Sequence, residues 1–435
     1  MPQPDATTAT PGARVRQSWL MRRIRDWRSP ATVWLGHWAL HAATFIVMLP
    51  LMIAGDTIGD LPLYREWASQ AISGGSMMGI DEPWVYPLLA WLPIGGAHIV
   101  GPVAYLAVWI LMTTALNTWA LRTLLRSGTR GAVLAGWAWL AAVLALSPVG
   151  MLRLEGITAP LVVVALAHLV HRPFFAGVLL AVATWIKVWP AAVIGAAVVL
   201  LRSRLTIVVA GASVTAGVAL LAVMLGGLDQ LTSFLSQQTS RNLQLEAPIA
   251  TPWVWMAMLD IDDAYVYQNH DIATREVVGP LDGSAMLLST PLMALTAIVA
   301  LVVAHRAVRL GHDRFEMLLL ASLTIATGLF AWNKVGSPQY MLWLLPIAVV
   351  GVAVGGAWWQ RMMVALVATG LVTTFIFPIA YMPLVDLQPW AVMLLTVRNV
   401  LLIAILAACL ARMVSLAGVQ VLGEQRPTTR ELVRV

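Results

Sequence analysis

Charged residues and cysteine are both scarce in this sequence. Charged residues make up 11% of its 435 positions, whereas a soluble domain carries about 25%. The single cysteine, Cys409, excludes an internal disulfide. Hydrophobic residues make up 60%, and many form apolar runs of about 18 residues or more, enough to cross a hydrocarbon core about 30 Å thick. A transmembrane β-barrel is excluded because its strands alternate apolar and polar residues. The sequence therefore predicts an all-α, polytopic transmembrane fold.

The basic residues are distributed in the pattern that orients a membrane protein. The net charge of +6 suggests a nucleic-acid partner at first, but 20 of the 27 Lys and Arg lie in the termini and in short gaps between apolar runs. Such loops face the cytoplasm. We therefore predict no nucleic-acid partner. We expect a plasma-membrane protein that contacts membrane lipids and has both termini inside. The expected parts are a basic arm over 1–32, a transmembrane domain over 33–412 and a tail over 413–435.

The apolar runs predict about 11 to 12 membrane segments and two long outer loops. The run over 33–54 is too long for a signal peptide and no cleavage site follows it, so we read it as a retained helix. The outer loops are expected over 55–101, with an interfacial helix over 61–73, and over 228–284. The remaining helices are expected near 101–121, 132–150, 157–170, 205–227, 285–305, 315–332, 340–356, 362–381 and 391–412, with a short outer turn over 333–339.

A break is predicted in the apolar stretch between Arg172 and Arg202. Both arginines belong inside, yet too few residues separate them for two full crossings. Two short or re-entrant helices that meet near Lys187-Val188-Trp189-Pro190 satisfy both. Because broken backbone at membrane depth is tolerated only where it is buried or lines a cavity, Lys187 is a candidate cavity residue.

Acidic residues gather on the predicted outer side, which holds 15 of the 21 Asp and Glu. Most of them, including Asp260, Asp262, Asp263 and Asp271, are interpreted as solvated loop residues. Asp60 is the candidate for chemistry, with Asp56 as its nearest alternative. A purely structural role for Asp60 is to cap the interfacial helix by accepting from free backbone N–H groups.

Seven basic residues lie outside or within the membrane in this topology. A cation inside the bilayer is a candidate functional residue because its burial is costly; the alternative is simple ion pairing or snorkelling. Some of these cations can together hold a phosphate at the outer interface, and Arg153-Leu154-Glu155 and the 240–246 segment add carboxylates and amides nearby. Structural ion pairing and interfacial packing are the alternatives for these two segments. The seven residues are Arg65, Arg153, Lys187, Arg241, Arg275, Lys334 and Arg398.

The first outer loop resembles a known enzyme family. Asp60 is followed four residues later by Tyr64 and then by Tyr86-Pro87, and the Lys187–Pro190 segment is similar to a run that such proteins often carry. Over about 55–346 the chain resembles glycosyltransferase family 87, of the GT-C membrane glycosyltransferases, which includes actinobacterial mannosyltransferases that use polyprenyl-phosphate mannose. The resemblance implies cell-envelope biogenesis, with a lipid-linked donor and a glycolipid or polysaccharide acceptor.

The resemblance also implies the chemistry and the residues that perform it. A lipid-phosphate sugar departs as a phosphate that cations stabilise, so an inverting displacement needs one base, and the family's early-loop aspartate corresponds to Asp60. No cofactor is implied, and His98 and His270 show no metal spacing; an Asp81-Glu82 cation site lacks support. The candidate substrate-binding residues are Tyr64, Arg65, Tyr86, Arg153, Glu155, Lys187, Arg241, Glu246, Lys334, Gln339, Tyr340 and Arg398.

The turn over 333–340 departs from the family's mannosyltransferases. Those enzymes tend to carry histidines where this chain has Gln339-Tyr340. Mannose remains the leading donor sugar, and a polyprenyl-phosphate arabinofuranose donor remains open. A transporter or flippase of lipid-linked sugars is the alternative from another class and would use Lys187 and Arg398 within the membrane. A non-catalytic assembly partner is the third.

Overall fold

The computed structural model describes residues 27–239, 241–270 and 274–419. Most of the predicted basic arm, Ser240, Asp271 and the end of the predicted tail lie outside these described residues. The first described helix, α2, begins at Pro30 and the last, α18, ends at Ala417.

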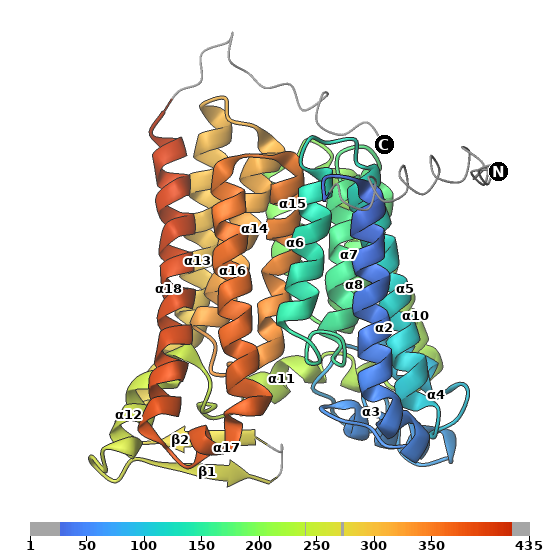
Figure 1. The fold of residues 1–435 in the computed structure, drawn as a ribbon, viewed down its shortest axis with the longest axis vertical. Coiled ribbons are helices and arrows are strands. Elements are labelled where there is room, and N and C mark those ends of the chain that lie inside the picture. Colours follow the sequence, from blue (N-terminus) through green and yellow to red (C-terminus); the bar gives the residue numbers. More distant parts are fainter. Residues whose placement is uncertain (1–26, 240, 271–273, 420–435) are drawn as a thin grey trace, which may run out of the picture.

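The described chain is a bundle of helices, as Figure 1 shows. Six helices are long and apolar enough to cross a membrane: α2 (Pro30–Ala54), α10 (Arg204–Met224), α13 (Asp282–Arg309), α14 (Arg314–Ala331), α16 (Ala357–Thr374) with the π-helical turn η5 (Phe375–Ile379), and α18 (Pro389–Ala417). Between them pack α5 (Tyr105–Arg126), α6 (Ala132–Ala145), α7 (Glu155–His168), α8 (Pro173–Ile186), α9 (Ala191–Leu200) and α15 (Leu345–Val354). These helices confirm the all-α polytopic prediction, and each lies where an apolar run was identified.

Short elements gather at one end of the bundle, the lower end in Figure 1. The expected interfacial helix is present there as α3, and the second long loop holds an antiparallel hairpin that the sequence analysis missed, with Tyr265 opposite Val278. The short elements are α3 (Leu61–Ile72), η1 (Leu88–Ala90), α4 (Trp91–His98), η2 (Leu228–Gln230), α11 (Ser233–Thr239), η3 (Pro248–Ala250), α12 (Thr251–Met258), β1 (Tyr265–Asn269), β2 (Thr274–Val278), η4 (Pro338–Trp343) and α17 (Tyr381–Val385).

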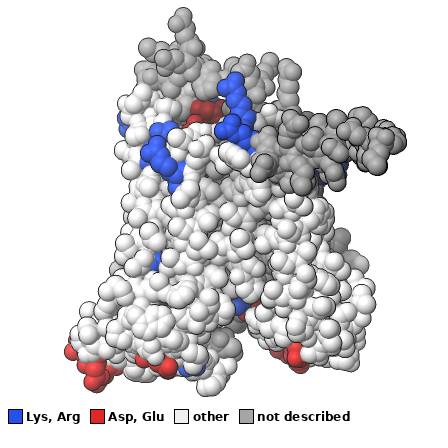
Figure 2. Space-filling model, viewed as in Figure 1, with Lys and Arg blue, Asp and Glu red and all other residues white. Residues whose placement is uncertain are grey.

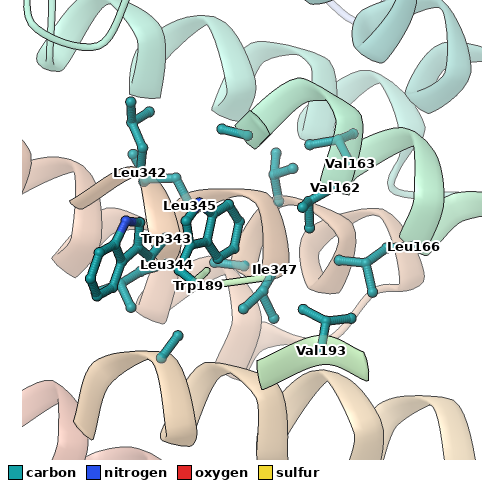
Figure 3. Packing of buried hydrophobic residues seen from close by; sticks show 14 of the residues in the cluster. Val162, Val163, Leu166, Trp189, Val193, Leu342, Trp343, Leu344, Leu345 and Ile347 are labelled. Carbon is teal, nitrogen blue, oxygen red and sulfur yellow. The ribbon is translucent and has the colours of Figure 1, made fainter. Parts of the chain in front are cut away.

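The core lies around α7, which is buried on every side from Glu155 to Leu166. A helix that is hydrophobic all round belongs in the interior. Val162 and Val163 of α7 lie near Val193 of α9 and near the η4–α15 segment (Figure 3). Trp189, in the break between α8 and α9, donates from Nε1 to Thr158 Oγ1 at 3.0 Å. This hydrogen bond joins the first turn of α7 to the break that precedes α9.

The two ends of the molecule differ in shape and charge on the face that Figure 2 shows. The lower end is hollowed between the side that holds α3 and α4 and the side that holds α12 and the β1–β2 hairpin. Acidic side chains mark both sides of this hollow, and most of the visible Lys and Arg lie at the opposite end.

Candidate active site

Asp60 lies immediately before α3 at the lower end of the bundle. Pro62 occupies the first turn of this helix, where a missing N–H costs nothing. In the described chain the Asp60 side chain makes no capping hydrogen bond. Instead, its carboxylate pairs with Arg153 and accepts from Tyr64 Oη at 3.3 Å. The capping alternative is therefore wrong, and Asp60 faces a cation and a phenol.

Two tyrosines continue the site from Asp60. The hydroxyl groups of Tyr64 and Tyr86 lie 3.3 Å apart, and the Tyr64 ring is 1% exposed and packs against Trp67 and Trp109. Burial raises the pKa of both Tyr64 and Tyr86 above the usual tyrosine range. Both phenols therefore stay protonated at neutral pH and can donate hydrogen bonds.

Lys187 lies in the predicted break between two short helices. α8 ends at Ile186, Lys187 is extended and α9 begins at Ala191, so the break is where the sequence predicted it. Lys187 Nζ lies 3.3 Å from Glu155 Oε1 and 4.3 Å from the centre of the Tyr86 ring. Glu155 is the first residue of α7, where the helix dipole also favours its negative charge.

The residues described so far form one wall of the site. A second wall is formed where the 243–247 segment meets the 333–339 turn. Gln244 N–H donates to the carbonyl of Lys334, and Gly336 N–H donates to Gln244 Oε1, both at 2.9 Å. A Cβ at Gly336 would lie 2.4 Å from the Glu246 carbonyl oxygen and from Ala247 N. Only glycine allows so close an approach of two backbones.

Glu246 and Arg398 are buried behind this wall. The Glu246 carboxylate accepts from Gln244 Nε2 at 3.1 Å, and its main-chain oxygen accepts from Arg398 at 2.6 Å. Burial raises the pKa of Glu246 to about 7, against the opposing charges of Arg398 and Arg153. The Nε and Nη1 of Arg398 have no hydrogen-bond partner among the described residues, so its ligand-binding role stays a prediction.

The positive charge of Arg241 acts on titratable groups in both walls. Burial raises the pKa of Tyr86 and of Tyr340, and the positive charge of Arg241 opposes both increases. Burial lowers the pKa of Lys334, and the charge of Arg241 lowers it further. Within the described parts of the chain, the buried Nε of Arg241 and Oε1 of Gln339 lack hydrogen-bond partners. Unsatisfied buried polar atoms need an explanation, and a bound ligand supplies one.

Three further residues that the sequence singled out are Arg65, Asp56 and Asp81. Arg65 donates to the carbonyl of Gly55 at 2.5 Å and thereby joins α3 to the end of α2. Asp56, the rival base, is exposed and belongs to no ion pair in the described chain. Asp81 accepts from Met77 N–H at 2.7 Å within a turn. In the parts of the chain that the structure covers, no three His, Cys, Asp or Glu are placed to hold a metal ion.

Sequence reasoning missed one aromatic residue beside Arg153. The Phe377 ring centre lies 6.0 Å from the Arg153 guanidinium carbon, a contact made possible by the π-helical turn at the end of α16. The scarcity of lysine in the composition was a signal that could have pointed to the site. The chain contains only two lysines, Lys187 and Lys334, and the charge of Arg241 acts on both.

The raised pKa of Glu246 predicts a pH dependence of stability. A carboxyl group whose pKa is higher in the folded than in the unfolded state binds more protons when folded, so stability falls as pH rises. We expect the free energy of unfolding to fall between about pH 4.5 and 7 by at most about 3 kcal/mol from this group. Glu246→Gln should remove that part of the slope. Thermal unfolding of both proteins across this pH range checks it, and equal slopes would contradict it.

One comparison with known proteins identifies the family of this chain. A sequence model of glycosyltransferase family 87 matches residues 84–338, more than half of the chain. This range includes Tyr86, Arg153, Glu155 and Lys187, whereas Asp60 and Arg398 lie outside it. Searches of curated proteins and of solved structures give no match. The chain belongs to glycosyltransferase family 87 and is a membrane glycosyltransferase.

Proposed function

We propose that this enzyme transfers mannose from a polyprenyl-phosphate donor to a glycolipid or glycan of the cell envelope. The observation that carries the proposal is the Asp60 carboxylate at the start of α3, next to a cluster of several cations. Arg153 pairs with Asp60 directly, Lys187 lies beyond the two tyrosines, and Arg241 acts on Tyr86 from the other wall. One base and several anion-binding groups are what this reaction requires.

The proposed reaction is a single inverting displacement. The acceptor hydroxyl oxygen forms a bond to the anomeric carbon while its proton passes to Asp60. The bond from that carbon to the donor phosphate oxygen breaks, and polyprenyl phosphate leaves with the electron pair. Lys187 and Arg241 stabilise the charge that develops on this phosphate. Arg153, which pairs with Asp60, would orient this carboxylate toward the acceptor hydroxyl.

The hollow lower end is proposed to face the outside of the plasma membrane. The positive-inside distribution of arginine supports this orientation, and Figure 2 shows most of the visible basic side chains at the opposite end. A donor with a long isoprenoid chain would reach the cluster from the bilayer, since Lys187 lies at the end of an apolar helix, α8.

A second donor sugar is considered because the 333–340 turn differs from that of the family's mannosyltransferases. Gln339 and Tyr340 are both 7% exposed and stand where the family's mannosyltransferases tend to have histidines. An arabinofuranose donor is therefore the alternative within the same reaction. The transporter interpretation has less support, because Lys187 is paired with Glu155 beside the predicted outer loops.

A donor panel tests the proposal. Purified protein in phospholipid vesicles would receive synthetic polyprenyl-phosphate mannose, polyprenyl-phosphate arabinofuranose or a nucleotide sugar, each with a mannosylated glycolipid acceptor. We expect product, detected by mass spectrometry, from the polyprenyl-phosphate mannose alone. Product from arabinofuranose alone would change the sugar, product from the nucleotide sugar would change the donor class, and faster lipid flipping without product would establish the transporter instead.

A further inference from the structure

A groove lies at the end of the bundle opposite the candidate active site. It has a volume of about 310 Å³ and lies between the first half of α2 and the last turns of α5. Both helices run along the same side of the bundle in Figure 1. None of its lining residues belongs to the active-site cluster. The lining residues are Trp34, Trp38, Thr118, Arg122, Leu125 and Arg126.

The groove combines cations with indole rings. Arg122 and Arg126 are exposed and lie one turn apart on α5, so both guanidinium groups are on the same face of this helix. In the described chain, neither has a carboxylate within the 4.0 Å of an ion pair. The Trp34 and Trp38 rings stack with centres 6.4 Å apart, and 53% of Trp38 is exposed.

A threonine adds a polar group to the lining of the groove, and a buried histidine lies against it. Thr118, which lines the groove, bonds to His37 Nε2 at 2.9 Å, and the His37 ring lies against both Trp34 and Trp38. His37 is fully buried, and its Nδ1 has no partner among the residues that the structure describes. Two guanidinium groups and the Thr118 hydroxyl therefore line the groove beside the indole rings, a lining that suits a polar, anionic ligand rather than acyl chains alone.

We propose that this groove binds the headgroup of an anionic glycerophospholipid. The two guanidinium groups suit a phosphate, because arginine forms paired charge-assisted hydrogen bonds with it. Tryptophan is favoured at the level of lipid headgroups, and the volume accommodates a headgroup and glycerol rather than a whole lipid. The acyl chains would lie in the bilayer along the exposed apolar face of α2, which includes Ile46 and Val47 at 66% and 67% exposed.

Lipid retention by the full-length protein tests this proposal. The protein, delipidated in detergent, would receive dioleoyl phosphatidylglycerol, dioleoyl phosphatidylcholine or inorganic phosphate, with bound molecules counted by native mass spectrometry. We expect one phosphatidylglycerol to be retained in preference to phosphatidylcholine. Arg122→Gln with Arg126→Gln should weaken this binding about 30-fold, as expected for removing two cations from a membrane surface.

A matched variant separates a specific site from general attraction to basic protein. Arg306 and Arg309 are two exposed arginines in the last turn of α13, at the same end of the bundle, and Arg306→Gln with Arg309→Gln removes the same charge. We expect this variant to retain the lipid. Equal retention of both lipids by the wild type, or equal losses from the two double variants, would overturn the proposal. Retention of inorganic phosphate as tightly as the lipid would reduce it to a simple anion site.

Discussion

Asp60→Asn is expected to lower the rate of sugar transfer by about 100- to 10,000-fold, the usual contribution of a general base. The variant keeps the shape of the side chain and an oxygen that can accept from Tyr64, whose hydroxyl lies 3.3 Å from Asp60 Oδ2. It loses the ability to take a proton from the acceptor hydroxyl. We expect the apparent affinity for the donor to change little, because the donor phosphate is assigned to Lys187 and Arg241. Initial rates at varied donor and acceptor concentrations check both parts.

Asp56→Asn is the matched control for this prediction. Asp56 lies four residues earlier in the same loop, is exposed and forms no ion pair within the described residues. We expect its rate to stay within about twofold of the wild type, since surface substitutions away from a site have small effects. Undiminished transfer by Asp60→Asn would refute the base assignment, and loss of transfer only in Asp56→Asn would move that assignment to Asp56.

A folding defect in Asp60→Asn is a separate outcome that one more variant addresses. The substitution also removes the ion pair with Arg153, which is 8% exposed. Arg153→Gln breaks the same pair but leaves the base in place. If the pair only holds the loop to the bundle, both variants should lose thermal stability and activity together. If Asp60 is the base, Arg153→Gln should keep far more activity than Asp60→Asn.

The sequence predicted the helices well because the bilayer leaves few alternatives. Every backbone polar group in hydrocarbon must be satisfied, so long apolar runs become helices, and α2, α10, α13, α14 and α18 each lie where such a run was identified. The break at Lys187 was also predictable, because Arg172 and Arg202 lie too close in the chain for two full crossings. The β1–β2 hairpin was not predicted, since its strands lie in a polar loop and pair, among the described residues, with each other and with the 243–245 segment.

Much of the candidate site required three-dimensional information. The Asp60–Arg153 and Glu155–Lys187 pairs join residues that lie far apart in the sequence, so neither partner could be assigned from spacing. The hydrogen bond of Arg398 to the main-chain oxygen of Glu246 could not be predicted either, because 152 positions separate the two residues. The same holds for the hydrogen bond from Arg65 to the Gly55 carbonyl, which joins α3 to the end of α2. The residue types of the site were predictable, whereas the choice of partner depended on packing.

The buried Glu155–Lys187 pair leads to the largest expected effect on stability. Glu155 is 1% exposed in its side chain and Lys187 is 16% exposed, so removing either charge leaves the other buried without compensation. We expect Glu155→Gln to lower the free energy of unfolding by about 3 to 5 kcal/mol. The same change at Glu316, whose pair with Arg412 is 3.8 Å long and 36% exposed on both sides, should cost about 1 kcal/mol or less. Unfolding of each variant in detergent, followed by tryptophan fluorescence, measures both.

The double variant Glu155→Gln with Lys187→Met separates the structural role of the pair from its proposed chemical role. Replacing a whole buried ion pair by neutral groups of similar size is often close to neutral, so the double variant should recover most of the stability that Glu155→Gln loses. Transfer should not recover, because Lys187 is assigned to the donor phosphate and the methionine side chain that replaces it carries no charge. Recovery of stability and transfer together would show that Lys187 only balances Glu155. Failure to recover stability would show that the two charges do not form a coupled pair.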